Sequence, residues 1–104
     1  MLSRLAGYLI AVRDGDSLHL ANLAVNQAYR RKGVGRALVC RLIEEAYGTG
    51  YSSIHLEVRQ SNEIAIALYR NLGFKTTAIA ENYYEGVEDA LIMSVESYGM
   101  VQQG

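Results

Sequence analysis

The chain reads Tyr29-Arg30-Arg31-Lys32-Gly33-Val34-Gly35-Arg36-Ala37-Leu38 where a cationic turn with two glycines opens into a helix-period apolar pattern. Backbone N–H groups at a helix start have no intrahelical partner, and the helix dipole places about half a positive charge there. The glycines would let a phosphate approach closely, and the four basic side chains would add longer-range attraction. The spacing is neither the dinucleotide-binding glycine pattern nor a Walker loop. The stretch predicts a pyrophosphate-binding turn, with an ordinary surface turn as the alternative.

The segments on both sides of this turn carry strand patterns. An apolar run and a returning strand flank the hairpin turn Asp14-Gly15-Asp16. The expected strands cover residues 7–12, 17–25, 53–59, 75–84 and 89–96. In the third strand, apolar residues alternate with His55, Glu57 and Arg59, so one of its faces is apolar and the other carries polar and charged side chains.

Two helices are predicted between these strands. The first begins at Val34, spans about 13 residues and is stopped by Gly48 and Gly50. Its apolar stripe is Val34, Leu38, Val39, Leu42, Ile43 and Ala46. The second helix is capped by Ser61 or Asn62 and ends at Gly73, and its expected apolar residues are Ile64, Ala65, Leu68 and Leu72. Because a helix connects two strands, at least one strand pair should be parallel.

Composition limits the class of protein. The 104 residues are enough for one domain with a small core, and we assign it to residues 1–96, followed by a polar tail at 97–104. The net charge of −1 favours neither nucleic acid nor an anionic membrane as a partner. Cys40 is the only cysteine, so no internal disulfide can form. No apolar run approaches the about 20 residues needed to span a bilayer, and we expect a cytoplasmic protein.

Several segments between residues 22 and 93 form a more specific pattern. They are Asn22-Leu23-Ala24-Val25, Arg30-x-x-Gly33-x-Gly35-Arg36-Ala37-Leu38, Leu56-Glu57-Val58-Arg59-x-Ser61-Asn62, Ala67-Leu68-Tyr69-x-x-Leu72-Gly73-Phe74, Asn82-Tyr83-Tyr84 and Glu88-Asp89-Ala90. In this order and spacing they resemble the GNAT acyltransferases, and among them the RimI-type ribosomal-protein alanine N-acetyltransferases. The resemblance implies an α/β (α+β) GNAT fold with a mixed, mostly antiparallel sheet, two main helices and a splayed parallel strand pair.

The resemblance also implies a binding site for acetyl-CoA as co-substrate. Leu23 and Val25 would line its pantetheine arm with main-chain groups, and the Val25 amide would face the thioester oxygen. The pyrophosphate would lie on the turn residues Arg30, Arg31, Lys32, Gly33, Val34, Gly35 and Arg36. Asn62 would reach the amide arm of the cofactor.

The implied reaction is direct acetyl transfer to a protein N-terminal α-amine, with a ribosomal protein as the type of acceptor. Glu57 resembles the general base of the family and Tyr69 its general acid. Asn82, Tyr83 and Tyr84 would lie in a loop that accepts the substrate N-terminus. His19 and His55 are too few and too scattered for a metal site, so we interpret both as structural and expect no metal.

The chain departs from the family pattern at its start. The family has a strand, two helices and another strand before the position of residues 5–12, and we expect this portion, one wall of the acceptor groove, to be missing here. The apolar strand at 7–12 would then form an open edge, which predicts a homodimer. Two alternatives remain open: a GNAT enzyme that acetylates a small-molecule or lysine amine, and a catalytically impaired CoA-binding or interaction module.

Overall fold

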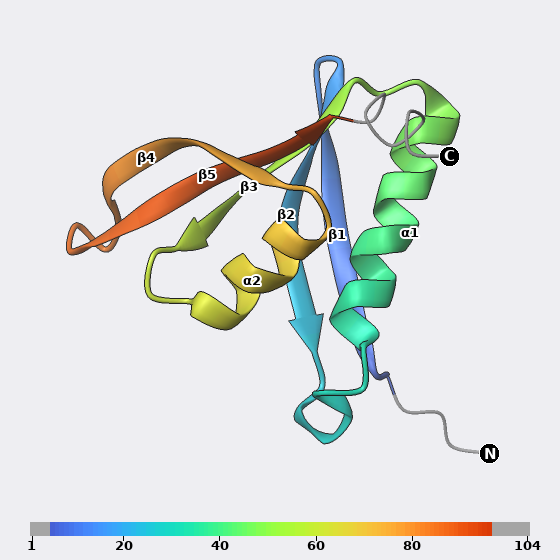
Figure 1. The fold of residues 1–104 in the computed structure, drawn as a ribbon, viewed down its shortest axis with the longest axis horizontal. Coiled ribbons are helices and arrows are strands. Elements are labelled where there is room, and N and C mark those ends of the chain that lie inside the picture. The colour runs from blue at the N-terminus through green and yellow to red at the C-terminus, as the bar shows by residue number, and fades with distance from the viewer. Residues whose placement is uncertain (1–4, 97–104) are drawn as a thin grey trace.

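The computed structural model describes residues 5–96, and the predicted tail at 97–104 lies outside them. The elements are β1 (Gly7–Asp14), β2 (Ser17–Val25), the 3₁₀ turn η1 (Gln27–Tyr29), α1 (Val34–Thr49), β3 (Ser53–Arg59), α2 (Glu63–Asn71), β4 (Lys75–Tyr84) and β5 (Glu88–Glu96) (Figure 1). All five predicted strands and both predicted helices are present. Neither helix of the described range has the length and apolar character to cross a membrane.

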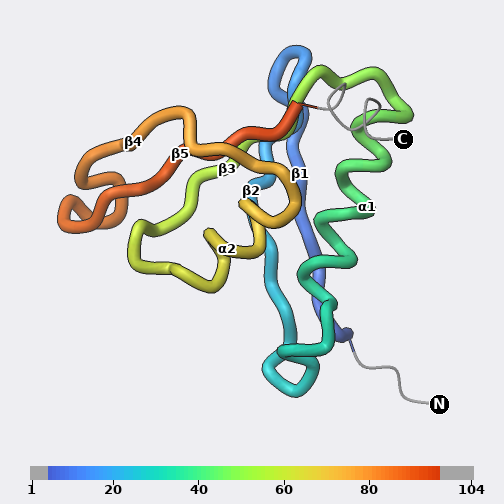
Figure 2. Tube along the Cα trace, in the orientation of Figure 1, coloured from blue at the N-terminus to red at the C-terminus, as the bar shows by residue number. Residues whose placement is uncertain are grey.

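The five strands form one sheet in the order β1-β2-β3-β5-β4. Neighbouring strands are antiparallel except for β2 and β3, which run parallel and are joined through α1. This confirms the predicted mixed, mostly antiparallel sheet with one parallel pair. Among the described residues, β1 and β4 are the two edge strands, and Figure 2 shows the long β4–β5 hairpin extending away from α1.

The parallel pair opens soon after it begins. β2 and β3 are paired only at Ser17↔Ser53, Leu18↔Ile54 and His19↔His55. Farther along β2, Leu20 and Asn22 pair with successive residues of β1, which leaves Ala21 as an extra residue in a β-bulge. A bulge bends its strand and increases the local twist. The remaining parts of β2 and β3 therefore diverge, and we call the opening between them the splay.

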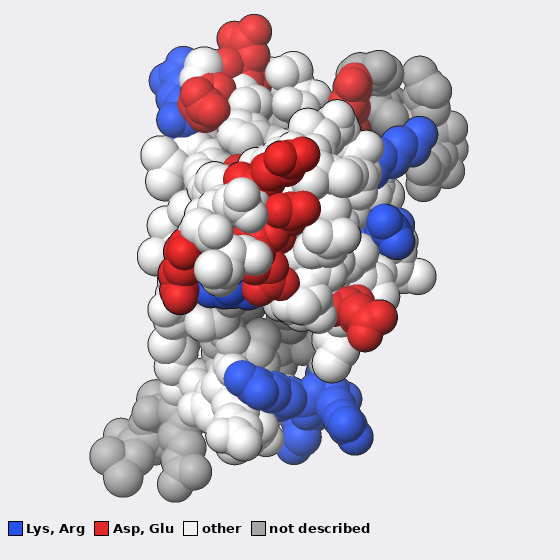
Figure 3. Space-filling view, turned by 90° about the vertical axis from the view of Figure 1, so that its left-hand side faces the viewer, with Lys and Arg blue, Asp and Glu red and all other residues white. Residues whose placement is uncertain are grey.

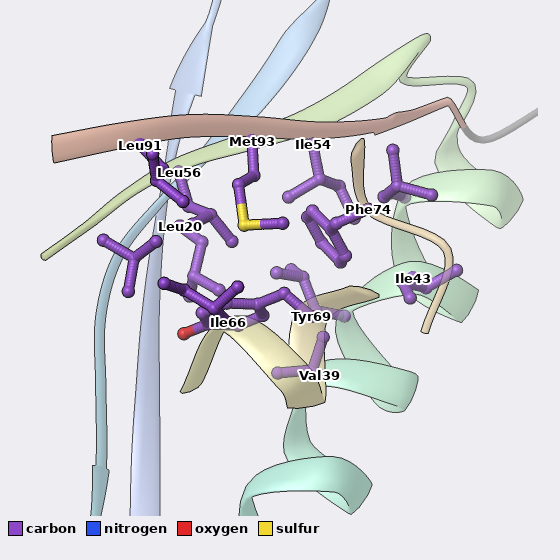
Figure 4. Close-up of a cluster of buried hydrophobic side chains, with 14 residues drawn as sticks. Leu20, Val39, Ile43, Ile54, Leu56, Ile66, Tyr69, Phe74, Leu91 and Met93 are labelled. Atoms are coloured by element: carbon purple, nitrogen blue, oxygen red, sulfur yellow. The ribbon is translucent and has the colours of Figure 1, made fainter. Parts of the chain in front are cut away.

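Both helices cover the same face of the sheet. The core contains Val39, Leu42, Ile43 and Ala46 of α1, Ile66 and Tyr69 of α2, and buried residues of β2, β3 and β5, including Leu20, Ile54, Leu56, Val58 and Met93 (Figure 4). Alternate strand residues point to opposite faces. Since Ile54, Leu56 and Val58 face the helices, His55 and Glu57 lie on the other face, which no described helix covers.

Two local predictions about the helices were wrong. Gly48 lies inside α1, which continues to Thr49 and is capped by Gly50 in the left-handed conformation (φ 87°). The apolar face assigned to α2 was shifted, because Ile64 is 87% exposed while Ile66 and Tyr69 are buried. The cap itself was predicted correctly, since the Asn62 side chain accepts a hydrogen bond from the Ala65 N–H at 3.2 Å.

Candidate functional site

The start of α1 has the features of an anion-binding site. Gly33 is the N-cap with φ 77° and provides no side-chain cap, and the first turn contains no acidic residue. The first main-chain bond is donated by Ala37 to the Gly33 carbonyl at 2.9 Å. Within residues 5–96, the N–H groups of Val34, Gly35 and Arg36 have no main-chain acceptor. These donors and the positive end of the helix dipole can hold a phosphate group.

The basic side chains of this turn differ in their surroundings. Arg36 donates from Nη1 to Oδ1 of Asn71 and so links the start of α1 to the end of α2. The Lys32 ammonium lies 5.8 Å from the centre of the Tyr29 ring. Arg31 has a positive φ of 65°. Arg30, Arg31, Lys32 and Arg36 are all exposed, so their charges face solvent around the turn.

Apolar side chains of β2 lie beside the same helix start. A Cβ atom on Gly35 would lie 3.6 Å from Val25 Cγ2, 3.9 Å from Leu23 Cδ2 and 3.7 Å from Leu68 Cδ2. The absence of a side chain at Gly35 thus opens space beside the end of β2. The structure brings together three residues that were predicted separately for the cofactor, namely Leu23, Val25 and Gly35.

The Val25 main chain faces the splay. Asn26 donates its N–H to the Ala6 carbonyl at 2.7 Å, on the β1 side of β2. Successive N–H groups of an extended strand point to opposite sides. The N–H of Val25 is therefore directed away from β1, toward the opening between β2 and β3.

The Glu57 carboxylate lies on the uncovered face, beside the splay. Its Oε1 is 2.8 Å from Nε2 of His19 and 3.5 Å from the hydroxyl of Tyr83. The Glu57 side chain is 19% exposed and that of His19 is 32% exposed. A partly buried carboxylate with a second oxygen, Oε2, outside both contacts can accept a proton from a ligand.

Tyr69 lies on the helix side of the sheet and is 7% exposed. Its ring packs against Phe74 at 5.5 Å between centroids, and its hydroxyl oxygen lies at the edge of the core cluster in Figure 4. Burial raises the pKa of Tyr69, and the nearby Tyr84 raises it further. No hydrogen bond joins Tyr69 to Glu57 in the described part of the chain, so the two predicted catalytic residues are not in direct contact.

Tyr84 influences, or is influenced by, the electrostatics of both predicted catalytic residues, because it raises the pKa of Tyr69 and Glu57 raises its own. Burial raises its pKa, and Tyr83 and Glu57 add to this effect while the Arg59 guanidinium opposes it. The Arg59 guanidinium lies 4.3 Å from the centre of the Tyr84 ring. The Tyr84 ring also packs edge-on against the Tyr83 ring, with 5.0 Å between centroids.

The three predicted acceptor residues lie at the irregular end of the strand predicted at residues 75–84, so the loop that the resemblance implied for them is wrong. Asn82, Tyr83 and Tyr84 belong to β4, where the pairing with β5 is interrupted between Ala80 and Tyr84. Asn82 has a positive φ of 52° and donates its N–H to Oδ1 of Asp89 at 2.9 Å. A bond from the backbone to a side chain replaces regular pairing here, and the hydroxyl of the next residue, Tyr83, lies 3.5 Å from Glu57 Oε1.

Arg59 and Glu88 connect this hairpin to the start of α2. Arg59 Nη1 lies 3.0 Å from Glu88 Oε1, and the Ser61 N–H donates to Glu88 Oε2 at 2.9 Å. These hydrogen bonds, first from Ser61 and then from Arg59, lower the pKa of the Glu88 carboxyl. The adjoining Asn62 uses its side-chain oxygen as the helix cap, so the amide nitrogen remains as its donor toward a ligand.

Charge is divided between the two ends of the splay. Figure 3 shows Lys and Arg atoms grouped at the lower end of the molecule, level with the turn before α1, and Asp and Glu atoms above them, over the end of the β4–β5 hairpin. Residues 81–89 contain four acidic residues and no basic one. The basic end favours an anion and the acidic end favours a cation.

The sequence alone did not indicate the contacts that His19 and Arg59 make at this site. The alternation in β3 placed Arg59 on the polar face, but nothing local indicated its contacts with Tyr84 and Glu88. His19 lies beside His55 only because β2 and β3 pair in this parallel register. That register depends on the crossover through α1, so no pattern within one segment could reveal it.

The profile of the acetyltransferase (GNAT) family matches residues 3–74. The chain is 44% identical over 95 residues to the [ribosomal protein bS18]-alanine N-acetyltransferase of Escherichia coli strain K12, in an alignment that covers 88% of this chain and 64% of that protein. The chain thus spans less than two thirds of the length of this relative. These matches confirm the family resemblance of the sequence.

Solved structures show the same fold. The crystal structure of the ribosomal-protein-S18-alanine N-acetyltransferase from Escherichia coli matches with a TM-score of 0.82 at 45% identity, over 88% of this chain and 61% of that one. A GNAT family acetyltransferase from Elizabethkingia anophelis, with acetyl-CoA bound, matches with a TM-score of 0.82 at 22% identity, over 89% of this chain and 69% of that one. The second match, at this low identity, supports the shared fold alone.

Proposed function

Because the chain belongs to the acetyltransferase (GNAT) family, we propose that it transfers an acetyl group from acetyl-CoA to the N-terminal α-amine of a protein. The observation that carries the proposal is the splay, which has an uncapped helix start with Gly33 and Gly35 at one end and the Glu57 carboxylate on the strand opposite β2. The similarity to a ribosomal-protein alanine N-acetyltransferase at 44% identity supports a ribosomal-protein N-terminus as the acceptor.

Acetyl-CoA is the proposed donor, with its pyrophosphate on the free N–H groups of Val34, Gly35 and Arg36. The pantetheine arm would follow Leu23 and Val25, where the missing side chain of Gly35 leaves room. Membership of the acetyltransferase (GNAT) family supports this choice of donor. Asn62 would donate to an amide of the arm through its side-chain nitrogen.

The amine chemistry fits a carboxylate base. An N-terminal α-amine has a pKa near 8 and a lysine amine one near 10.4, so deprotonating the former near pH 7 is easier by about 3 kcal/mol. Glu57 would take the proton directly or through a water molecule, and the amine would attack the thioester carbonyl. The N–H of Val25 is directed toward the splay and would stabilise the resulting oxyanion by about 3 kcal/mol.

Tyr69 would assist the departing thiolate, chiefly by donating a hydrogen bond. A thiol has a pKa near 8.5 and a tyrosine one near 10, so complete proton transfer is uphill by about 2 kcal/mol. Burial raises the pKa of Tyr69 and widens this gap. The same shift keeps the hydroxyl protonated, which a hydrogen-bond donor requires.

The acceptor would enter beside Asn82, Tyr83 and Tyr84. The hydroxyl of Tyr83 is close to Glu57, and the acidic end of the β4–β5 hairpin would attract an ammonium group. The acidic residues would also attract a lysine or small-molecule amine, so the activity test below includes these acceptors. A CoA-binding module without activity is the remaining alternative.

We further propose that two copies associate through β1. This edge strand exposes Tyr8, Ile10 and Val12 by 42%, 47% and 51%, and no charged residue interrupts residues 7–12. Apolar open edges favour strand pairing with another chain. A two-fold, self-complementary contact is the usual form of such association.

The function is tested by following CoA release from acetyl-CoA with three sets of acceptors: peptides with a free N-terminus, the same peptides blocked at the N-terminus but containing lysine, and polyamines. Release is expected only with free N-termini. Activity only with lysine or polyamines would mean that the acceptor is a lysine or small-molecule amine and not an N-terminal α-amine. Calorimetric binding of acetyl-CoA without release in any set would identify a binding module.

A further inference from the structure

His19 contacts the proposed base at the point where the two parallel strands separate. His19 and His55 are the last paired residues of β2 and β3. Glu57 lies two residues farther along β3 on the same face, and no main-chain pair joins it to β2. The 2.8 Å contact between His19 Nε2 and Glu57 Oε1 is therefore a side-chain link across the opening of the splay.

The imidazole of His19 is itself held in place. It stacks on the ring of His55 with 5.0 Å between centroids and an interplanar angle of 9°. His55 is fixed at both ring nitrogens, since Nε2 lies 3.2 Å from Asp14 Oδ2 and Nδ1 lies 3.3 Å from Ser17 Oγ. The orientation of His19 thus depends on contacts that begin at the β1–β2 hairpin.

This arrangement directs one N–H bond at one carboxylate oxygen. Nε2–H of His19 and the more distant Tyr83 hydroxyl both approach Oε1 of Glu57. With Oε1 occupied, Oε2 is the oxygen left to face an incoming amine. A carboxylate fixed in this way is oriented before the substrate arrives, which matters because a displacement of about 1 Å in a reacting group can lower a rate about 100-fold.

We propose that His19 is a positioning residue for the acetyl-transfer reaction: its Nε2–H holds the Glu57 carboxylate so that Oε2 faces the amine. The inference rests on the proposed function and replaces the structural interpretation of His19 made from sequence. His55, Ser17 and Asp14 act through His19. The bond lies on the acceptor side, so its loss should slow turnover without changing the affinity for acetyl-CoA.

Two substitutions separate the N–H bond from the ring. His19→Phe keeps a flat ring that can stack on His55 but removes the donor. His19→Gln removes the ring but places a side-chain N–H near the position of Nε2. We expect His19→Phe to lower kcat about tenfold or more with an unchanged KM for acetyl-CoA. His19→Gln should recover most of the rate, and thermal melting of both variants checks that they are folded.

The result that overturns the proposal is a folded His19→Phe variant with wild-type kcat, or a His19→Gln variant as slow as His19→Phe. If the wild-type chain acetylates no acceptor in the panel, the proposed function fails, but this result does not test the role of His19. Crystal structures of the wild type and of His19→Phe then test whether His19 positions the Glu57 carboxylate. A changed Glu57 side-chain conformation in the variant supports positioning by His19. An unchanged conformation contradicts it.

Discussion

The start of α1 and the irregular end of β4 lie at opposite ends of the splay and differ in the atoms that carry their chemistry. At α1 the donors are main-chain N–H groups, and the decisive residues are glycines. At β4 the side chains of Tyr83, Tyr84, Glu57 and His19 make the contacts. The first region is built from one helix and its turn, whereas the second depends on three strands keeping their positions.

This difference predicts how each region responds to change. A main-chain site tolerates exchange of nearby side chains but is sensitive to the backbone conformation of its glycines. A side-chain site loses its chemistry when a single functional group is replaced. The α1 end should therefore control the affinity for acetyl-CoA, and the Glu57 end should control the rate.

The largest expected effect follows from replacing Glu57. Glu57→Gln keeps the shape of the side chain but cannot take a proton, so kcat should fall about 100-fold or more at neutral pH. The dissociation constant for acetyl-CoA, measured by calorimetry, should change less than about twofold. Glu44→Gln on the exposed side of α1 removes the same charge away from the splay and is the matched control. Wild-type activity in Glu57→Gln would remove Glu57 from the role of base.

The second prediction concerns the uncovered side of the sheet at β1. Ile10→Lys places a charge where the proposed dimer buries an apolar side chain, and should weaken self-association about 10- to 100-fold. Analytical ultracentrifugation over a range of protein concentrations measures the dissociation constant of the dimer. Ile64→Lys changes an isoleucine that is 87% exposed on the opposite, helix-covered side and should leave the dimer intact. A wild-type chain that stays a folded monomer at high micromolar concentration would contradict the dimer.

Local patterns predicted the strands and helices well because each depends on its own residues. Ser17–Val25 and Ser53–Arg59 have the predicted bounds, since their apolar alternation and flanking turns are local signals. The family pattern also indicated Leu23, Val25 and Gly35, which the structure brings together. The bulge at Ala21 and the positive φ of Asn82 were not predicted, because both arise from how two strands pair and not from the pattern of either segment alone.

The same distinction explains the errors. α2 is short, and the choice between Ile64 and Ile66 as the buried residue depends on how the helix is rotated against the sheet. The contact of His19 with Glu57 was not predicted, because it appears only when β2 and β3 are placed in register. Sequence therefore indicated the backbone site at α1 more fully than the side-chain site around Glu57.

A third prediction tests the backbone site. Gly33 has φ 77°, and Val would be strained there by about 1–2 kcal/mol although no atom within 4 Å would obstruct its Cβ. Gly33→Val should weaken acetyl-CoA binding about tenfold by displacing the N–H groups at the start of α1. Gly48→Ala lies in α1 with open space around it and should leave binding unchanged. Unaltered affinity in a folded Gly33→Val variant would contradict the pyrophosphate site.

The smallest effect is expected at Tyr69, which belongs to the core as much as to the site. Tyr69→Phe keeps the ring against Phe74 and removes only the hydroxyl, so kcat should fall by about 3- to 10-fold. Tyr47→Phe removes the same group from an exposed tyrosine of α1 and is the control. An unchanged rate would reduce Tyr69 to a packing role.

The raised pKa of Tyr69 adds a test of its environment. Because the folded state holds this proton more tightly than the unfolded state, the stability that Tyr69 contributes is complete below about pH 10 and is lost as pH rises through the raised pKa. Chemical denaturation at pH 8 and pH 10.5 should show a larger loss of stability in the wild type than in Tyr69→Phe. Equal losses would mean that the hydroxyl is solvated, and a solvated hydroxyl would not be held in place to donate to a departing thiolate.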